Sequence, residues 1–184
     1  GWALAACCLP LGMVASGADG PWPSFYRGTA RRGYQDVDAP ASPRNVKWQV
    51  EVPHGVSQGG ISIGTGNRIY FKTNGGTDGS YVFCLDTTDG SVIWRSEKLG
   101  GSLGNYAGVE VAEDAIYYCN NVDPSAVFKA NPDTGAVIWR REIGTSPRGT
   151  PVCGTVANPN GNPNVYVWLR EDGQIVALDS VSGD

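Results

Sequence analysis

The chain has 184 residues, of which 26 are glycine and 12 are proline, and only 17% of its side chains are charged while 10% are aromatic. Such a turn-dense, aromatic-rich composition is typical of many short strands joined by tight turns. The net charge is −4. The one cluster of basic residues, formed by Arg27, Arg31 and Arg32, is interpreted as a solvated segment. Nucleic acid is therefore not expected as a partner, because binding phosphates requires clustered lysine and arginine.

Residues 1–18 are interpreted as the remainder of an export signal. Trp2–Ala15 is an almost unbroken apolar run that is too short to span a membrane as a mature helix. The small residues Ser16–Ala18 before Asp19 fit a signal-peptidase site. A lipoprotein signal with a lipid anchor at Cys7 is the alternative. Both interpretations predict an exported protein that is periplasmic, secreted or displayed on the cell surface, without a transmembrane anchor in the mature chain.

A repeat of about 45 residues organises the rest of the chain. Gly90–Arg95 recurs 45 residues later as Gly135–Arg140, and Asn45–Trp48 is an earlier, weaker copy. Two other sets of residues recur at a similar spacing. The first, the tyrosine column, consists of Tyr70, Tyr117 and Tyr166. The second, the turn column, has an Asp or Asn followed four residues later by Gly: Asp86 with Gly90, Asn131 with Gly135, and Asp179 with Gly183. Repeats of this kind bury their hydrophobic faces only against their neighbours.

Each repeat is predicted to hold four strands. In the copy at 57–97, apolar and β-branched residues fall into short runs that are separated by Gly, Asn and Asp turns. The predicted strands are 59–64, 68–72, 81–85 and 91–96. Four strands in about 45 residues is the size of one blade of a β-propeller.

Further blades are expected at about 105–143 and 148–184. The third is incomplete, because its sequence stops at Asp184, before a tryptophan could follow Gly183 by four residues. A strand predicted at 45–52 precedes the first blade and would complete the last blade of a closed ring. An Asn/Pro/Gly stretch at 158–164 is predicted to be a surface loop. The sequence thus predicts an all-β, partial propeller.

The repeat resembles the tryptophan-docking motif of pyrroloquinoline-quinone-like (PQQ-like) propellers, which is Ala-x-Asp-x-x-Thr-Gly followed by three residues and Trp. Leu85–Trp94 resembles it, Ala130–Trp139 follows it with Asn131 in place of Asp, and Ala177–Gly183 matches as far as it runs. The resemblance covers about residues 45–184. It implies about three four-stranded antiparallel blades of a seven- or eight-bladed ring, from a BamB-type or related exported propeller.

In propellers of this family, the tryptophan wedges between adjacent blades against the glycine turn. The resemblance therefore assigns the repeated residues to blade docking and not to a ligand: Trp48, Trp94, Trp139, Asp86, Gly90, Gly135, Asp179 and Gly183. Trp22–Gly28 looks like the aromatic lead-in that precedes the first repeat of exported members. Residues 19–44 are accordingly taken as a lead-in segment.

The resemblance also raises an enzymatic function, that of a quinoprotein dehydrogenase that oxidises alcohols or sugars with PQQ and Ca²⁺. That chemistry requires a carboxylate base, oxygen ligands for calcium and cationic partners for the quinone. One branch of the family also uses a vicinal disulfide, but the adjacent pair Cys7–Cys8 lies in the export segment. His54 is the sole histidine, which rules out a cluster of histidines within the chain, and it is interpreted as a polar surface group in a loop. No catalytic residue, metal ligand or cofactor is assigned.

A binding function draws on residues expected at the entrance to the innermost strands. Gln58, Asn105, Tyr106 and Arg148 could line an axial funnel for a peptide, glycan or small anion. Each could instead be a strand-end polar residue that is bonded to backbone. The favoured function is a non-catalytic scaffold or binding module for an envelope or extracellular protein, peptide or glycan, and the PQQ-dependent dehydrogenase is the alternative.

Three cysteines remain after the export segment: Cys84, Cys119 and Cys153. Their spacing matches no zinc motif. Each falls in a predicted strand, where it would behave as a small buried hydrophobe. A disulfide between two of them is the alternative.

Overall fold

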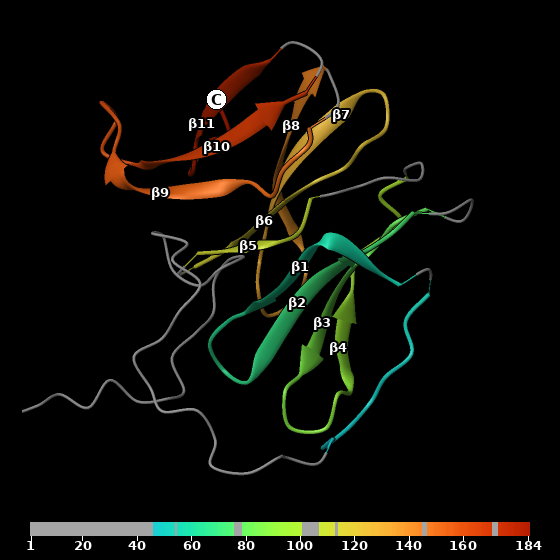
Figure 1. Ribbon diagram of the computed structural model, residues 1–184. Coiled ribbons are helices and arrows are strands. Elements are labelled where there is room, and N and C mark those ends of the chain that lie inside the picture. The colour runs from blue at the N-terminus through green and yellow to red at the C-terminus, as the bar shows by residue number, and fades with distance from the viewer. Residues whose placement is uncertain are drawn as a thin grey trace, which may run out of the picture.

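The computed structural model shows three antiparallel β-sheets and no helix in the part of the chain that it describes (Figure 1). None of the described residues therefore lies in a helix that is long and apolar enough to cross a membrane. The described residues are 46–53, 55–75, 79–100, 107–112, 114–144, 147–170 and 173–184.

The first sheet is a four-stranded meander in which each strand pairs with the next one along the chain. Its strands are β1 (Val56–Ile63), β2 (Arg68–Thr73), β3 (Val82–Asp86) and β4 (Val92–Arg95). These bounds lie within a few residues of the strands predicted from the sequence. Tight turns with glycine at positive φ separate the strands, as at Gly90 with φ 77°.

The second and third sheets repeat this meander. The second consists of β5 (Glu110–Val111), β6 (Ile116–Cys119), β7 (Ser125–Ala130) and β8 (Val137–Gly144). The third, in the order β11-β10-β9, consists of β9 (Val152–Ala157), β10 (Pro163–Leu169) and β11 (Gln174–Asp179).

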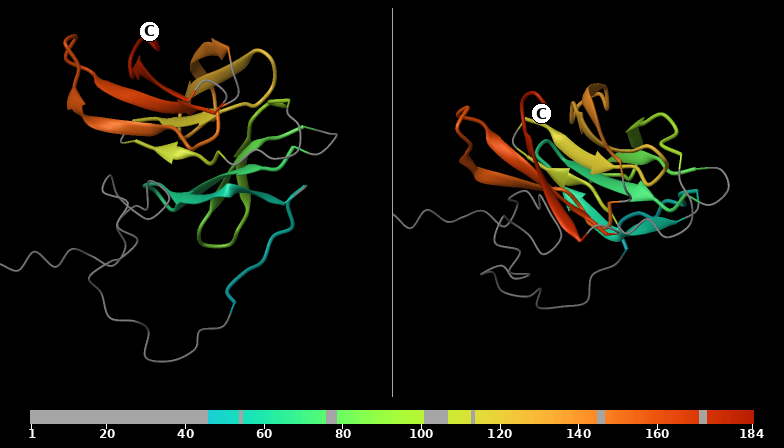
Figure 2. Two further views of the ribbon diagram at one scale, coloured as in Figure 1. Left: turned by 45° about the horizontal axis from the view of Figure 1, so that its top comes forward. Right: turned by 90° about the horizontal axis from the view of Figure 1, so that it is seen from above.

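The first strands of the three sheets lie next to one another, and the sheets fan out from them (Figure 2). The Ser57 hydroxyl donates to the carbonyl of Ala107 at 3.0 Å, and the Gly108 amide donates to Thr150 Oγ1 at 2.9 Å. A Cβ atom on Gly59 would lie 1.9 Å from the Gly108 nitrogen, so the two backbones can approach this closely only without a side chain. This is the arrangement of propeller blades around an axis, and the predicted all-β, partial propeller is confirmed.

Side chains of alternate strand residues fill the spaces between the sheets. The first and second sheets enclose a cluster that includes Tyr70, Val82 and Tyr118. The second and third enclose another that includes Tyr117 and Val165. Each sheet therefore buries its faces against its neighbours, as the repeat period indicates.

The strand predicted at 45–52 is not present in the described part of that segment. Residues 46–52 have no strand pairing, because a strand exists only where a neighbour completes its ladder of hydrogen bonds. Trp48 nevertheless packs beside the buried Phe71 and Leu85, on the face of the first sheet that points away from the second. The docking side chain is thus in place without the strand.

Side chains of the loop predicted at 158–164 form hydrogen bonds that its polar sequence does not indicate. The Asn158 and Asn162 side-chain amides both donate to the Asp179 carboxylate, at 2.9 Å and 3.0 Å. The same carboxylate accepts the backbone amides of Val181 and Ser182. These four donors hold the pKa of Asp179 well below its ordinary value, with the Asn158 amide as the largest cause.

Cys84, Cys119 and Cys153 are free thiols. Cys84 and Cys119 are fully buried, and burial raises their pKa to about 11 and about 12. In these two positions cysteine acts as a small hydrophobic residue, and the alternative of a disulfide between two of the three is not found.

The outer face of the third sheet exposes large apolar side chains in the described structure. Tyr166 is 41% exposed, Trp168 50% and Ile175 72%. The pairing of Tyr166 with Ala177 and of Trp168 with Ile175 puts them on one face. Their counterparts on the first and second sheets, Tyr70 and Tyr117, are buried against the next sheet.

We expect the chain to self-associate through this face, because contiguous apolar surface of this kind favours association. Static light scattering should show a weight-average mass that rises with protein concentration. The double variant Trp168→Glu with Ile175→Lys should suppress the rise, whereas Val156→Lys, at an exposed position on β9, should suppress it less. A constant monomer mass for the parent chain would contradict the prediction.

Candidate functional site

One carbonyl in each docking turn receives side-chain donors from the preceding sheet. The Trp94 indole donates to the Pro132 carbonyl at 3.0 Å, and the Tyr70 hydroxyl donates to the same oxygen at 3.1 Å. The next sheet repeats this, since Trp139 and Tyr117 donate to the Ser180 carbonyl at 3.2 Å and 3.4 Å. The tyrosine and tryptophan columns therefore act together as connectors between blades.

The glycine of each turn provides the surface on which the tryptophan ring packs. A Cβ on Gly135, which has φ 72°, would lie 2.7 Å from the Trp94 ring. Gly90 faces Trp48 and Gly183 faces Trp139 in the same manner. Trp48 also donates to the Thr87 carbonyl at 2.9 Å. The hydrogen bond from a tryptophan indole to a turn carbonyl therefore occurs three times.

The residues that flank the column tyrosine differ from sheet to sheet. On the first sheet Tyr70 pairs with Ser62 and Cys84. On the second sheet Tyr117 pairs with Glu110 and Lys129. Directly paired residues lie on the same face, so the second sheet presents a carboxylate, a phenol and an ammonium in one row toward the third sheet.

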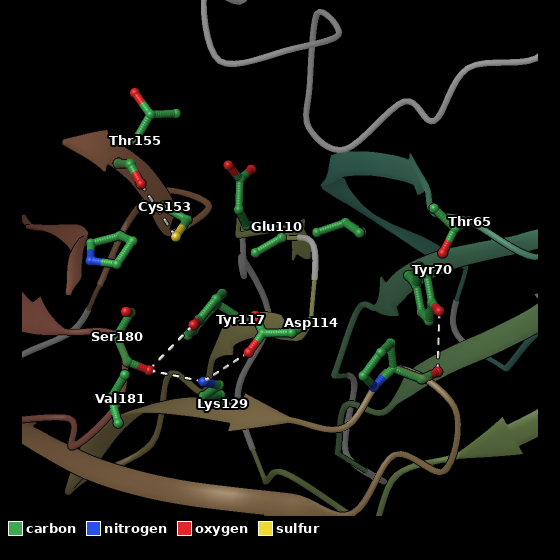
Figure 3. A pocket seen from close by; sticks show the side chains of 15 residues that line it. Thr65, Tyr70, Glu110, Asp114, Tyr117, Lys129, Cys153, Thr155, Ser180 and Val181 are labelled. Atoms are coloured by element: carbon green, nitrogen blue, oxygen red, sulfur yellow. Dashed lines mark hydrogen bonds and ion pairs between the residues drawn. The ribbon is translucent and has the colours of Figure 1, made fainter. Parts of the chain in front are cut away.

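A cleft of about 630 Å³ lies above this row, between the second and third sheets, and it extends to Thr65 and Tyr70 of the first sheet (Figure 3). Lys129 is 7% exposed, and its ammonium donates to the Ser180 carbonyl at 3.1 Å and pairs with Asp114 at 3.7 Å. It also lies 5.9 Å from the centre of the Tyr117 ring. The Ser180 carbonyl thereby accepts three side-chain donors from the second sheet.

The third sheet contributes Cys153 and Thr155 to the cleft, and Glu110 of the second sheet also lines it (Figure 3). Burial raises the pKa of the Cys153 thiol, and the carboxylates of Glu110 and Asp114 raise it further, while the Lys129 ammonium lowers it. The thiol is thus kept protonated at neutral pH and is a poor nucleophile. The cleft combines charged groups with apolar walls, which suits binding better than covalent chemistry.

The predicted funnel residues are not brought together by the described structure. Arg148 precedes β9, and its backbone amide donates to the Trp168 carbonyl at 3.1 Å. Gln58 belongs to β1, but its side chain lies outside the described structure, as do Asn105 and Tyr106 altogether. Their role as a funnel stays a prediction.

Sequence reasoning passed over Glu110 and Lys129. A signal was available in the sequence, because both can be placed by aligning the repeats on the tyrosine column and asking which residues pair with it. The tyrosine and turn columns can be found by comparing the sequence with itself because they recur, whereas the cleft is built from positions whose residue differs from repeat to repeat.

The described residues do not form a metal site, since no group of three or more His, Cys, Asp and Glu side chains gathers among them.

Comparison with known proteins shows the family. The family model described as outer membrane protein assembly factor BamB matches residues 36–184, which is more than half of the chain. No curated protein sequence matches.

Solved structures of PQQ-like propellers have the same fold. The quinohemoprotein alcohol dehydrogenase ADHIIG from Pseudomonas putida HK5 superimposes with a TM-score of 0.65 at 19% identity, over 90% of this chain and 26% of that one. BamB from Moraxella catarrhalis gives 0.55 at 20% identity, over 75% and 41% of the two chains. The quinohemoprotein alcohol dehydrogenase from Comamonas testosteroni gives 0.54 at 18%, over 84% and 26%.

The chain spans about a quarter to two-fifths of the length of these propellers. At such low identity the likeness extends to the fold alone. Together with the match over residues 36–184 and the repeated docking contacts, it shows that the chain belongs to the BamB family of PQQ-like β-propellers.

Proposed function

We propose that this chain is part of a non-catalytic binding and scaffolding propeller that acts outside the cytoplasm, where it holds a segment of an envelope or extracellular protein. The observation that carries the proposal is the cleft between the second and third sheets, which has apolar walls and charged groups from Glu110, Asp114 and Lys129. A pocket of this composition buries part of a side chain and orients it by a few polar contacts.

Different residues join the sheets and line the cleft, and this separation supports a scaffold. The repeated aromatic and turn residues are used to join the sheets, as with Trp94 on Gly135 and Trp139 on Gly183. They hold the blades in fixed positions, while the varying residues of the cleft remain for recognition. Residues 1–18, interpreted as an export signal, support a location outside the cytoplasm.

The alternative is a PQQ- and calcium-dependent dehydrogenase, and the fold likeness to two quinohemoprotein alcohol dehydrogenases favours it. If the quinone were bound, it would supply the oxidising group of that reaction. Among the described residues, no group of three or more His, Cys, Asp and Glu side chains gathers to support this alternative.

The test is an array of peptides taken from envelope proteins, followed by fluorescence anisotropy of each labelled hit with the full chain. Thr155→Trp should block binding, because this exposed residue lines the cleft and a large ring would fill it. Thr88→Trp, at an exposed turn of the first sheet, should leave binding unchanged.

A parallel titration with PQQ plus Ca²⁺, followed by absorbance, separates the two functions. The scaffold proposal predicts no saturable change at micromolar quinone. Saturable quinone binding, or peptide binding that is indifferent to Thr155→Trp, would overturn the proposal.

A further inference from the structure

The turn that leads from β9 into β10 is rich in asparagine, since residues 158–164 read Asn-Pro-Asn-Gly-Asn-Pro-Asn. Asn158 and Asn162 are half-buried, and their side-chain amides donate to the Asp179 carboxylate at 2.9 Å and 3.0 Å. Asn160 lies between them and is exposed, and its side chain forms no hydrogen bond with the described residues. The turn therefore contains two asparagines that anchor Asp179 and one that anchors nothing.

An asparagine side chain can lose its amide by reaction with the backbone of the next residue. The backbone nitrogen of that residue gives up its proton and attacks the side-chain carbonyl carbon, a cyclic imide forms, and ammonia leaves. Water then opens the imide at one of its two carbonyls, which gives aspartate or isoaspartate. The sum of the two steps consumes one water and releases one ammonia, so no other reactant is required.

The residue that follows each asparagine of the turn decides which of them can react. Asn158 and Asn162 are both followed by proline, which has no N–H and cannot form the imide in this way. Asn164 is followed by a buried valine of β10, whose branched side chain restricts the backbone. Asn160 is followed by Gly161, which has an N–H and no side chain. The two anchoring asparagines are thus protected, and Asn160 is not.

The surroundings of Gly161 leave room for the reaction. Gly161 is exposed, it has φ 85°, and nothing lies within 4 Å of the position of an added Cβ. Its amide donates to the Asn158 carbonyl at 2.9 Å, so this one hydrogen bond must open before the nitrogen can attack. A hydrogen bond in an exposed turn opens at low cost, because water can replace either partner.

The sequence contains one other Asn-Gly pair, Asn74–Gly75, and its surroundings differ. Gly75 is buried, and Asn74 is half-buried with its backbone amide bonded to the Gly55 carbonyl at 3.0 Å. An imide at this position would require buried backbone to move and water to enter. The fold should therefore distinguish two sites that have the same local sequence.

We propose that Asn160 is a site of spontaneous deamidation in the folded chain, where water converts it to a mixture of aspartate and isoaspartate. Isoaspartate adds a methylene group to the backbone of the turn, between the two residues that hold the Asp179 carboxylate. Asp179 begins the docking turn of the third sheet, in which Gly183 packs on Trp139. The modification therefore loosens the joint between the second and third sheets. The inference does not depend on the scaffolding function.

The test is incubation of the full chain at physiological temperature, at pH 7 and at pH 9, followed by peptide mapping. Trypsin releases residues 149–170 and 73–95 as separate peptides, and digestion at mildly acidic pH prevents new conversion. Fragmentation in the mass spectrometer locates each exchange of NH₂ for OH, and electron-transfer fragmentation separates isoaspartate from aspartate.

Asn160 should convert about tenfold faster than Asn74 in the folded chain, because opening buried backbone adds to the barrier at Asn74. Its rate should be higher at pH 9, because the attacking nitrogen must lose its proton. Asn158, Asn162 and Asn164 should remain intact. In urea, where the fold no longer protects Asn74, the two Asn-Gly pairs should convert at similar rates. Equal rates in the folded chain, or no conversion of Asn160 while the unfolded chain reacts, would overturn the proposal.

Urea unfolding of aged protein tests the effect on the joint. The midpoint of the parent chain should fall as isoaspartate accumulates. Asn160→Gln is the matched control, because its longer side chain closes an imide far more slowly, and its midpoint should not change with age. Asn160→Asp adds the charge without the extra methylene and should lower the midpoint less than isoaspartate does. A loss of the same size in aged Asn160→Gln would show that the damage lies elsewhere, and the proposed loosening of the joint would be wrong.

Discussion

Gly135→Ala should lower the free energy of unfolding by about 2–4 kcal/mol, the sum of strain at positive φ and overpacking of a filled contact. Gly135 has φ 72°, and an added Cβ would lie 2.7 Å from Cε3 and 2.8 Å from Cδ2 of Trp94. The ring cannot retreat without losing the indole hydrogen bond to the Pro132 carbonyl. The substitution therefore disturbs the joint between the first and second sheets.

Gly144→Ala is the matched control, because Gly144 has φ 79° but nothing within 4 Å of the position of its added Cβ. It should cost about 1–2 kcal/mol, from backbone strain alone. Both variants are compared by urea unfolding at one fixed protein concentration. Equal losses for the two variants would show that the ring contact contributes nothing and would contradict the docking role of Gly135.

Lys72→Met should stabilise the chain at pH 7 by about 3 kcal/mol. Lys72 is fully buried between the first and second sheets, and its ammonium donates to the Cys119 carbonyl. Burial lowers its pKa from 10.5 to about 8. Between these two values the folded state binds fewer protons than the unfolded state, so this lysine's contribution to stability rises as pH increases. Below pH 8 its full cost is present.

The measurement is the difference in unfolding free energy between Lys72→Met and the parent chain from pH 6 to 11. The advantage of the variant should be constant up to pH 8 and shrink toward pH 10.5. Taking the difference also reduces the contribution of thiols such as Cys84, which titrate in both proteins. A variant less stable than the parent at pH 7 would show that the ammonium's hydrogen bond outweighs its burial.

Local turn chemistry and spacing made the blades predictable. Asp86 and Gly90 favour a turn through local interactions, and the two-residue period places Trp94 on one face of its strand. The strands of the first sheet accordingly lie close to their predicted positions. Residues 46–52 have no strand pairing in the described structure, and the role predicted for 45–52, to complete the last blade of a closed ring, stays a prediction.

The cleft could not be read from the sequence in the same way. Glu110 and Lys129 are 19 residues apart in the sequence and stand side by side with Tyr117 only because β5, β6 and β7 pair in register. The Ser180 carbonyl that Lys129 contacts belongs to another sheet, 51 residues away. Pairing between sheets is a long-range property that no local pattern encodes.

The sequence by itself determined the repeat, the all-β class and the residues that join the blades, because these depend on local spacing and on turns that recur. Only the tertiary structure decided that the tyrosine column shares one carbonyl with the tryptophan, that a buried lysine lies between two sheets, and that the buried Tyr118 hydroxyl has no hydrogen-bond partner among the described residues. The physical reason is that burial and hydrogen-bond partnership are set by neighbours that arrive from distant parts of the chain.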